Sequence, residues 1–466
     1  MSLRLTTPDL VAATGGRLVV PPGAVAPAAV TGVATDSRTA APGDLFVALR
    51  GPATDGHRFV ADAVARGAVL ALVSKPSAAA GVAAVVVDDT LRALGAVAAL
   101  WRRRLSLTVV GVTGSVGKTT TVALTAHVLE RRFTVARTAE SWNAEIGVPL
   151  ALLRLRAEHQ VAVLEMAMRG PGQIRDLAVM ARPRLGVVTL IGDAHLELLG
   201  SREAIAAAKA ELLESLPDDG VAIVNVDDPW TPRLLRGVRC QVLRAGLGAG
   251  AEVRASDVVP SETGMTFTLH AGGAQVQAAL PLPGRHQVQN AVLAAAVGVA
   301  LGVSLPEVAA GLARARPPRM RQQVVSVADV LVIDDSYNAS PQSMRAAFDA
   351  LMQVGGARRR VLVLGEMREL GPQAYEMHRE VGRSAAALRP AFLLAVGPAA
   401  RAYLEGAMAA GAPPEALAWV PNVQAALPLL RSVVGPGDAV LVKGSRAVEM
   451  EHLVAGLGAR EPAGSP

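Results

Sequence analysis

Short apolar runs alternate along the chain with longer stretches in which apolar positions recur every three or four residues. In the first part, the strand-like runs are residues 18–20, 45–49, 69–73 and 83–87. Helical spacing appears at residues 59–66 and again at residues 91–104, as in helices with one buried face. The pattern predicts a small α/β domain over residues 1–87, followed by a helix.

From residue 107 to about residue 316, the order strand, loop, helix repeats. The predicted strands are residues 108–112, 161–164, 185–190 and 221–224, and the predicted helices are residues 119–130, 174–180, 202–216 and 289–301. This alternation is typical of a mostly parallel sheet covered on both faces. Residues 251–279 alternate without helices, which predicts a small antiparallel insertion. We therefore predict a central domain over residues 88–316.

A proline- and arginine-rich segment, residues 315–321, interrupts this order and predicts a linker. Beyond it, the predicted strands are residues 330–333, 361–364, 392–396 and 440–442, and the predicted helices are residues 345–352 and 376–388. This indicates a doubly wound, Rossmann-like domain over residues 317–466. The fold class is therefore α/β with three domains, which suits a chain of 466 residues.

Composition narrows the class of protein. With 51% hydrophobic and 18% charged residues, the chain is not intrinsically disordered. Its single cysteine excludes an intrachain disulfide. The net charge of +6 comes mainly from scattered arginines without interleaved aromatic residues, so no nucleic-acid partner is expected.

Residues 287–306 carry no charge, but glycine, asparagine and a final proline interrupt them. They predict a pair of buried helices rather than a membrane span. The N-terminus lacks the long apolar stretch of a signal peptide, and no coiled coil or exposed apolar stripe is evident. We expect a cytoplasmic protein that is a monomer.

A glycine-rich turn provides the strongest local signal. A β-branched run leads into Gly114, Gly117, Lys118 and Thr119, and a helical pattern follows. Backbone N–H groups of such a turn wrap a phosphate, and the helix N-terminus adds a positive dipole. Lys118 can neutralise phosphate oxygens and Thr119 can bind Mg²⁺. Val112 stands where the usual P-loop pattern has its first glycine. The turn predicts nucleoside-triphosphate binding, which kinases, switches, motors and ligases share.

Polar residues follow the next strands. Glu165 follows the run 161–164, and His195 follows the run 185–190 after a short loop. Carboxyl ends of parallel strands meet at one edge of a sheet, so Glu165 is expected beside the P-loop, within reach of Mg²⁺. Taken alone, His195 reads as an ordinary loop histidine, and Lys209 as a surface lysine on an amphipathic helix.

Together these segments resemble the Mur ligases, ATP-dependent amide-bond ligases of peptidoglycan synthesis. The matching segments are Gly114-Ser-Val-Gly-Lys-Thr-Thr120, Asn143-Ala-Glu-Ile-Gly-Val-Pro149, Glu165, Ala194-His-Leu-Glu197, Ala208-Lys-Ala-Glu-Leu212, Gly284-Arg-His-Gln-Val-Gln-Asn-Ala291 and Asp334-Asp-Ser-Tyr-Asn-Ala-Ser-Pro341. Leu190, Leu198, Leu199, Gln287, Pro318 and Ser340 depart from the motifs, each beside an implied ligand rather than at one.

Further segments resemble the family members that add a dipeptide. They are Asp36-Ser-Arg38, Gly43-Asp-Leu-Phe-Val-Ala-Leu49, Asp55-Gly-His57, Leu364-Gly-Glu-Met-Arg-Glu-Leu-Gly371, His378 and Lys443-Gly-Ser-Arg446. The resemblance implies that ATP phosphorylates the carboxylate of a UDP-N-acetylmuramoyl-tripeptide. The amine of D-alanyl-D-alanine then captures the acyl phosphate, giving UDP-MurNAc-pentapeptide, ADP and phosphate.

The resemblance also implies residue roles. The residues that it implies for ATP binding are Gly114, Ser115, Val116, Gly117, Lys118, Thr119, Thr120, Asn290, Arg319 and Asp335. The ligands that it implies for two Mg²⁺ ions are Thr119, Glu165, His195 and Lys209, the last as a carbamate formed with CO₂. The implied catalytic residues are Lys118, Lys209, His195 and Glu165; the implied substrate-binding residues are Ser37 and Arg38 for the UDP-sugar and Tyr337 and Asn338 near the dipeptide.

Three alternatives remain open at this stage. A sister ligase that adds one amino acid would carry an Asp-Asn-Pro-Arg motif in its last domain, which is absent here. Folylpolyglutamate synthase shares the P-loop but lacks a UDP-sugar domain. A P-loop switch would hydrolyse nucleotide without an amine acceptor. Phosphate release measured with and without D-alanyl-D-alanine separates these classes.

Overall fold

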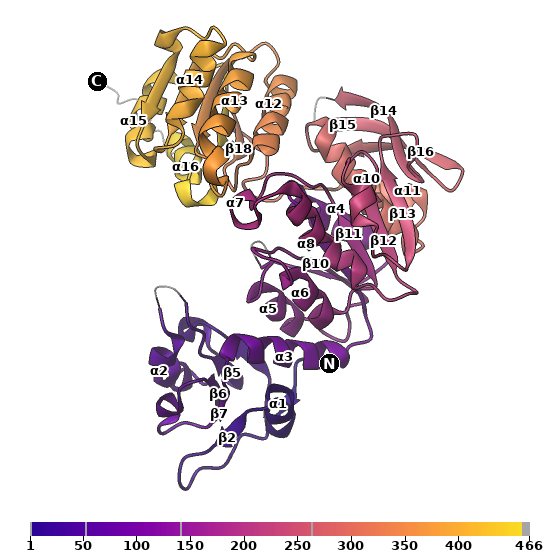
Figure 1. Ribbon diagram of the computed structural model, residues 1–466, viewed down its shortest axis with the longest axis vertical. Coiled ribbons are helices and arrows are strands. Elements are labelled where there is room, and N and C mark those ends of the chain that lie inside the picture. The colour runs from indigo at the N-terminus through magenta and orange to yellow at the C-terminus, as the bar shows by residue number, and fades with distance from the viewer. Residues whose placement is uncertain (1, 52–53, 140–141, 262–263, 459–466) are drawn as a thin grey trace.

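The computed structural model describes residues 2–51, 54–139, 142–261 and 264–458. Within them the chain forms three α/β bodies that follow one another along the longest axis of the molecule (Figure 1). The predicted class, α/β with three domains, is confirmed. The end of the last predicted domain, residues 459–466, lies outside the described residues.

The N-terminal body is built on a five-stranded sheet. In spatial order the strands are β2 (Arg17–Val19), β7 (Ala84–Val86), β6 (Leu70–Val73), β5 (Asp44–Val47) and β4 (Gly32–Ala34). Strands β1 (Leu5–Thr6) and β3 (Ala29–Val30) form a separate pair, and the helices are α1 (Thr7–Thr14) and α2 (Val60–Ala65). The four predicted strands match β2, β5, β6 and β7 to within two residues at each end. β2 pairs antiparallel with β7 and the others are parallel.

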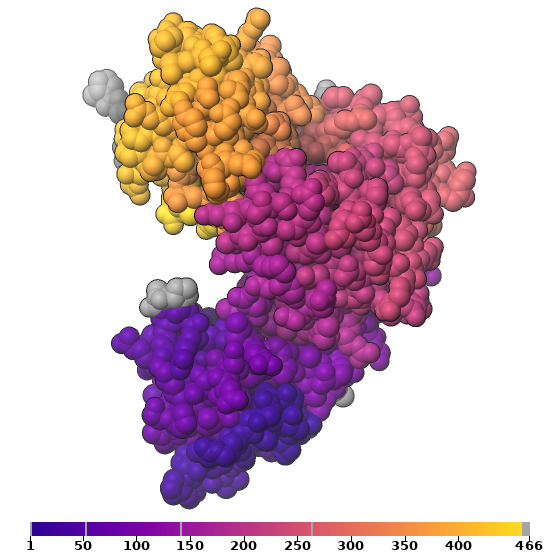
Figure 2. All heavy atoms as spheres, in the orientation of Figure 1, coloured from indigo at the N-terminus to yellow at the C-terminus, as the bar shows by residue number. Residues whose placement is uncertain are grey.

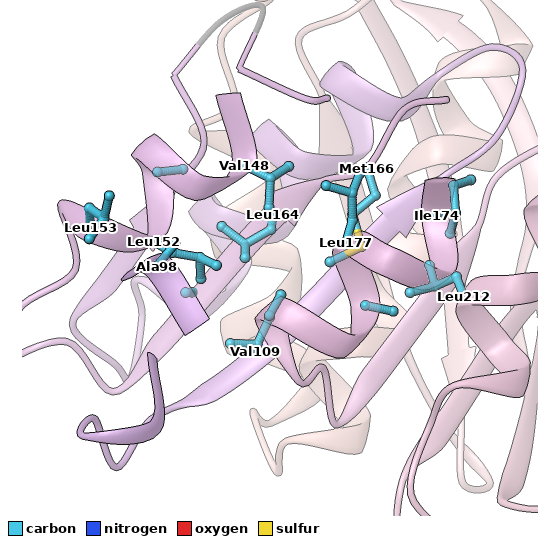
Figure 3. Packing of buried hydrophobic residues seen from close by; sticks show 14 of the residues in the cluster. Ala98, Val109, Val148, Leu152, Leu153, Leu164, Met166, Ile174, Leu177 and Leu212 are labelled. Carbon is cyan, nitrogen blue, oxygen red and sulfur yellow. The ribbon is translucent and has the colours of Figure 1, made fainter. Parts of the chain in front are cut away.

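Helix α3 (Thr90–Arg103) connects the first body to the second. Asp89 begins it by accepting hydrogen bonds from the N–H groups of Leu91 and Arg92, a common N-cap. Its apolar face packs between α1 and the central-body helices α5 (Gly147–Leu153) and α6 (Gln173–Ala181). In Figure 3, Ala98 of α3 lies beside Leu152 of α5. One hydrophobic core therefore continues from the N-terminal body into the central body.

The central body carries a nine-stranded sheet. In spatial order its strands are β16 (Ala274–Leu280), β15 (Gly264–Ala271), β14 (Val253–Ser261), β13 (Gln241–Gly246), β12 (Val221–Asn225), β11 (Leu185–Val188), β8 (Thr108–Thr113), β10 (Val161–Glu165) and β9 (Val135–Arg137). All neighbours from β9 to β14 are parallel, and β14, β15 and β16 are antiparallel. The predicted antiparallel segment is confirmed, but it extends the edge of this sheet because β14 pairs with β13.

Helices cover both faces of the inner strands. On one face lie α4 (Lys118–Leu129), α10 (Arg285–Ala300) and α11 (Leu305–Ala313). On the other face lie α5, α6 and α8 (Arg202–Glu214), where Leu164 lies beside Val148 of α5 and Met166 lies beside Leu177 of α6 (Figure 3). Residues 287–306 cover most of α10, which is buried as predicted, and then a partly exposed turn and the start of α11. None of the helices in the described ranges is long and apolar enough to span a membrane.

The C-terminal body has a six-stranded sheet. In spatial order its strands are β17 (Gln323–Val327), β18 (Val330–Asp335), β22 (Asp438–Lys443), β19 (Arg359–Gly365), β20 (Phe392–Val396) and β21 (Leu417–Val420). Only the pair of β17 and β18 is antiparallel. The covering helices are α12 (Pro341–Gly355), α13 (Ala374–Ala386) and α14 (Arg401–Ala409) on one face, and α15 (Val423–Val433) and α16 (Glu451–Gly458) on the other.

Candidate active site

A cavity of about 780 Å³ lies between the central and C-terminal bodies. Predicted site residues that line it are Ser115, Val116, Gly117, Lys118, Thr119, Thr120, Glu165, His195, Asn290, Asp335, Tyr337 and Asn338. Gly114, Lys209, Arg319, Ser37 and Arg38 do not line it. The space-filling view shows a separate hollow between the N-terminal body and the other two (Figure 2).

The glycine-rich turn between β8 and α4 takes a shape that only glycine adopts easily. Gly114 has φ +148° and Gly117 has φ +86°. A Cβ on Gly117 would lie 2.4 Å from Oδ1 of Asn290. The N–H of Ser115 donates to the carbonyl of Leu190 at 2.7 Å, which fixes the turn against the loop after β11. The turn therefore presents its backbone to the cavity, as a phosphate site requires.

Thr119 and Glu165 form the acidic side of this turn. The Thr119 hydroxyl donates to Oε2 of Glu165 at 2.7 Å, and the amide of Asn143 donates to Oε1 at 2.8 Å. Glu165 is 5% exposed, and its N–H donates to the Thr138 hydroxyl at 3.0 Å. The carboxylate is therefore held in one orientation at the end of β10.

Two amines lie near this carboxylate, one on the cavity wall and one in the interior. Lys118 donates from Nζ to the carbonyl of Gly114 at 2.9 Å, and burial lowers the pKa of its amine. Lys209 in α8 is 1% exposed, so it is not the surface lysine that its local pattern predicts. Burial, and then the charge of Lys118, lower the pKa of Lys209 well below its ordinary value, against the pull of Glu165. Such an amine is readily neutral, which makes it a nucleophile.

A chain of amides joins the turn to the linker between the bodies. The Thr121 hydroxyl contacts Oδ1 of Asn290 at 3.4 Å, and Asn290 donates to Gln287 at 3.0 Å. Gln287 donates to Oε1 of Gln322 at 3.1 Å, and Nε2 of His286 lies 2.9 Å from the same oxygen. Burial lowers the pKa of His286. Asn290, the implied adenine-side residue, is thus connected to the linker.

The C-terminal wall contains a buried ion pair. Nζ of Lys443 lies 2.6 Å from Oδ2 of Asp335 and donates to the carbonyl of Asn338 at 2.9 Å. The guanidinium of Arg321 stacks over the ring of Tyr337, 4.0 Å from its centroid. Arg321 lines the cavity, whereas Arg319, the predicted interdomain arginine, is exposed and lies outside the lining.

His195 lies at the junction of the two bodies. Its Nδ1 is 2.7 Å from Oε2 of Glu369, in the loop after β19. The nearby imidazole lowers the pKa of Glu369. Both side chains line the cavity.

Ser37 and Arg38 lie apart from this cavity, in the N-terminal body. Ser37 is buried, and the exposed Arg38 forms a two-pronged ion pair with Asp36, with Nη2 to Oδ2 at 2.6 Å. The guanidinium lowers the pKa of Asp36 to about 2. A phosphate that bound Arg38 would have to share its guanidinium with the carboxylate of Asp36.

Asn143, Lys443, Glu369 and Arg321 are polar residues of the site that had no role in the sequence-based assignment. Asn143 and Lys443 stood inside matched motifs, so the motifs themselves were the signal. Glu369 also stood inside a matched segment, but its partner belongs to another body. Arg321 is two residues from the predicted Arg319, and only the stacking on Tyr337 distinguishes them.

Oxygen donors beside the phosphate turn suit Mg²⁺. Within the described ranges, no three His, Cys, Asp or Glu side chains cluster closely enough to hold a metal unaided. Nucleotide-bound Mg²⁺ needs few protein ligands, because water and phosphate oxygens complete its shell. The hydroxyl of Thr119 and the carboxylate of Glu165 lie 2.7 Å apart. These two residues therefore fit the ion.

Comparisons with known proteins agree with this geometry. Three family models match: "Mur ligase family, catalytic domain" over residues 29–102, "Mur ligase middle domain" over residues 112–298, and "Mur ligase, glutamate ligase domain" over residues 320–446. The UDP-N-acetylmuramoyl-tripeptide–D-alanyl-D-alanine ligase of Mycobacterium leprae is 39% identical, covering 96% of this chain and 97% of its own.

Solved structures are similar over the same extent. MurF from Acinetobacter baumannii has a TM-score of 0.90 and 36% identity, covering 98% of this chain and 100% of its own. MurF ligase from Thermotoga maritima in complex with ADP has a TM-score of 0.80 and 28% identity, covering 91% and 96%.

Proposed function

The chain belongs to the Mur ligase family, and we propose that it joins D-alanyl-D-alanine to UDP-N-acetylmuramoyl-tripeptide with ATP. The observation that carries this proposal is the cavity between the central and C-terminal bodies. It brings the phosphate turn and Glu165 of the central body opposite Asp335, Tyr337 and Asn338 of the C-terminal body. Relatives named for this reaction match nearly end to end.

The charges of the site suit an anionic reactant pair. Lys118 and Arg321 bring positive groups to the cavity that the carboxylate of Glu165 also lines. ATP and the tripeptide carboxylate repel each other, so cations that face both lower the barrier to their approach. The N–H groups of the turn and the ammonium of Lys118 would hold the γ-phosphoryl group against the attacking carboxylate. The acyl phosphate is then open to the dipeptide amine.

Thr119 and Glu165 are the residues that would hold Mg²⁺, with His195 as the proposed ligand of a second ion. When bound, Mg²⁺ supplies positive charge to the phosphate oxygens. The two bodies around the cavity hold the reactants in line, and positioning of this kind accounts for much of such catalysis. ATP and nucleotide-linked precursors occur in the cytoplasm, where we place the reaction.

The identity of the product tests the proposal. The protein is incubated with ATP, D-alanyl-D-alanine and UDP-N-acetylmuramoyl-tripeptides that end in either meso-diaminopimelate or L-lysine. We expect the mass of a UDP-linked pentapeptide, and phosphate release that requires the dipeptide. A product that carries one added amino acid would assign the chain to a sister activity. Phosphate release independent of any amine would indicate a hydrolase or switch.

We also propose that Lys209 reacts with CO₂ to form a carbamate. Its buried, readily neutral amine is the form that attacks CO₂, and the anionic product would offset the positive charge of Lys118. We expect Lys209→Ala to lose most activity and to recover part of it with formate or acetate. Lys118→Ala, which removes a lysine from the same site, should gain nothing from these acids. Full activity of Lys209→Ala without added acid would contradict the carbamate.

A further inference from the structure

The contact between His195 and Glu369 joins two bodies of the molecule. His195 immediately precedes α7 (Leu196–Leu199) of the central body, and Glu369 follows β19 of the C-terminal body. Figure 1 shows α7 directly against the C-terminal body. The 2.7 Å approach of Nδ1 to Oε2 therefore exists only while these bodies are docked.

The backbone holds this contact from both sides. His195 has φ +66° and Glu369 has φ +63°, left-handed conformations that are uncommon for residues with side chains. The N–H of Glu197 donates to the carbonyl of Glu369 at 3.2 Å. A Cβ on Gly371 would lie 3.3 Å from Cα of Glu197, so the two loops approach closely. Strained conformations persist where the surroundings fix them, and they gather at functional sites.

The chemistry of the imidazole determines which of its two nitrogens can bind a cation. Nδ1 of His195 is buried and has no aligned hydrogen-bond partner among the described residues, while the Glu369 carboxylate lies 2.7 Å away. A small rotation of the ring lets Nδ1–H donate to that carboxylate. Nε2 is then the nitrogen with a free lone pair, on a side chain that lines the cavity. Carboxylates prepare histidines for metal binding in this way.

We propose that Glu369 is a positioning residue for the metal site, supplied across the domain junction. By accepting from Nδ1 it fixes the tautomer and ring orientation in which Nε2 of His195 faces the cavity. It acts only when the C-terminal body is docked, so cation affinity and docking are coupled. By reciprocity, a bound cation favours the docked arrangement. The inference rests on the metal role proposed above for His195.

Mn²⁺ titrated into the ADP-bound full-length protein tests the inference, with the ion followed by electron paramagnetic resonance. We expect Glu369→Ala to weaken Mn²⁺ binding about 10- to 100-fold, the usual effect of losing such a partner. Glu369→Gln keeps an acceptor oxygen and should lose less. Glu197→Gln removes a carboxylate from the same junction that forms no hydrogen bond or ion pair with the imidazole, and it should bind Mn²⁺ as the wild type does.

A spectroscopic readout separates positioning from a merely structural effect. Electron spin-echo modulation from a coordinated imidazole nitrogen should be present in the wild type and in Glu197→Gln, absent in His195→Gln and reduced in Glu369→Ala. Unchanged Mn²⁺ affinity and unchanged nitrogen modulation in both Glu369 variants would overturn the inference, as would absence of nitrogen modulation in the wild type. Should Glu369→Ala not fold, Glu369→Gln carries the same comparison. The product assay is independent, so failure of the ligase proposal is distinguishable from failure of this one.

Discussion

Lys443 and Asp335 are paired in the interior of the C-terminal body. Their side chains are 2% and 8% exposed, and they lie opposite each other in the register of β22 and β18. Burial lowers the pKa of Lys443, while the carboxylate of Asp335 opposes that shift. Loss of one partner leaves the other charge buried and uncompensated, which is far more destabilising than loss of both.

Lys443→Met should therefore lower the free energy of unfolding by about 3–5 kcal/mol. The double variant Lys443→Met with Asp335→Leu should regain most of this loss. Urea denaturation of the full chain, followed by circular dichroism, measures both. Lys75→Met, which removes an exposed lysine paired with Asp55, should cost less than about 1 kcal/mol and serves as the control. If Lys443→Met lowered the free energy of unfolding as little as Lys75→Met does, the expected cost of an unpaired buried charge would be contradicted.

Gly117 is the position at which the phosphate turn tolerates no side chain. Gly117→Ala would strain a residue at φ +86° and force the amide of Asn290 to move. Strain of about 1–3 kcal/mol at this position should weaken ADP binding roughly 5- to 150-fold. Calorimetric titration with ADP measures the loss. Gly170→Ala, at a glycine where an added Cβ would meet nothing within 4 Å and φ is not positive, should leave binding unchanged.

At the scale of elements, the start of α1 is held by a reciprocal cap. The hydroxyl and N–H of Thr6 donate to the carboxylate of Asp9, and the N–H of Asp9 donates to the Thr6 hydroxyl. Arg104, just past the end of α3, lies 2.8 Å from the same carboxylate. The hydrogen bond from Thr6, and then that from Arg104, lower the pKa of Asp9 to about 2 from 3.8.

A group whose pKa is lowered on folding stabilises the protein above its unfolded pKa. Asp9→Asn should thus lower the free energy of unfolding by about 0.5 kcal/mol at pH 6, since the pair is at the surface. The difference from the wild type should shrink as the pH falls from 3.8 towards 2. Thermal unfolding at several pH values measures it. Asp62→Asn, in the first turn of α2, provides a control, and a difference that grows on acidification would contradict the expected sign.

The elements that the sequence predicted well are those whose local pattern agrees with their burial. Strands such as β10 and β20 are short β-branched or aliphatic runs buried on both faces. Among the helices that were not predicted, two have local signals that oppose helix. α5 begins with Gly-Val-Pro and α15 contains Pro428, residues that disfavour helix. Both form because packing buries one face, as with Ala426 and Leu430 of α15.

The same distinction, between local pattern and contacts made on folding, applies to the residues of the site. Lys118 and Thr119 follow from a contiguous motif, but the burial of Lys209 depends on packing that no local pattern contains. Arg321 and Glu369 act through contacts made only after folding. Gln287, which departs from the family motif, still donates to the linker and accepts from Asn290, because its longer amide reaches both.

At the scale of the whole molecule, the bodies are not joined equally. α3 places Trp101 in a core that continues from the N-terminal body into the central body, and its indole N–H donates to the carbonyl of Leu155 at 3.0 Å. The fully buried residues of the C-terminal cores all come from that body. The first two bodies should therefore unfold together, and the third separately.

Trp101→Ala should destabilise the shared unit by about 3–5 kcal/mol through loss of buried surface and the cavity left behind. Scanning calorimetry should show the transition of the N-terminal and central bodies at a lower temperature, while the transition of the C-terminal body stays where it is in the wild type. Phe348→Ala, in the core of the C-terminal body, should move only the other transition. Equal movement of both transitions in either variant would show that the cores are energetically continuous.

The four lysines of the chain lie at different depths, and this turns them into natural reporters for amine-reactive labelling. Lys75 has an exposed side chain, Lys118 stands on the cavity wall, and Lys209 and Lys443 are 1% and 2% exposed. A reagent added to the native protein should tag Lys75 first, and nucleotide should shield Lys118. Tags on Lys209 and Lys443 would appear only as the interior of each body opens. One mass spectrum would thus report the accessibility of the surface, the occupancy of the cavity by nucleotide, and the transient opening of the central and C-terminal cores.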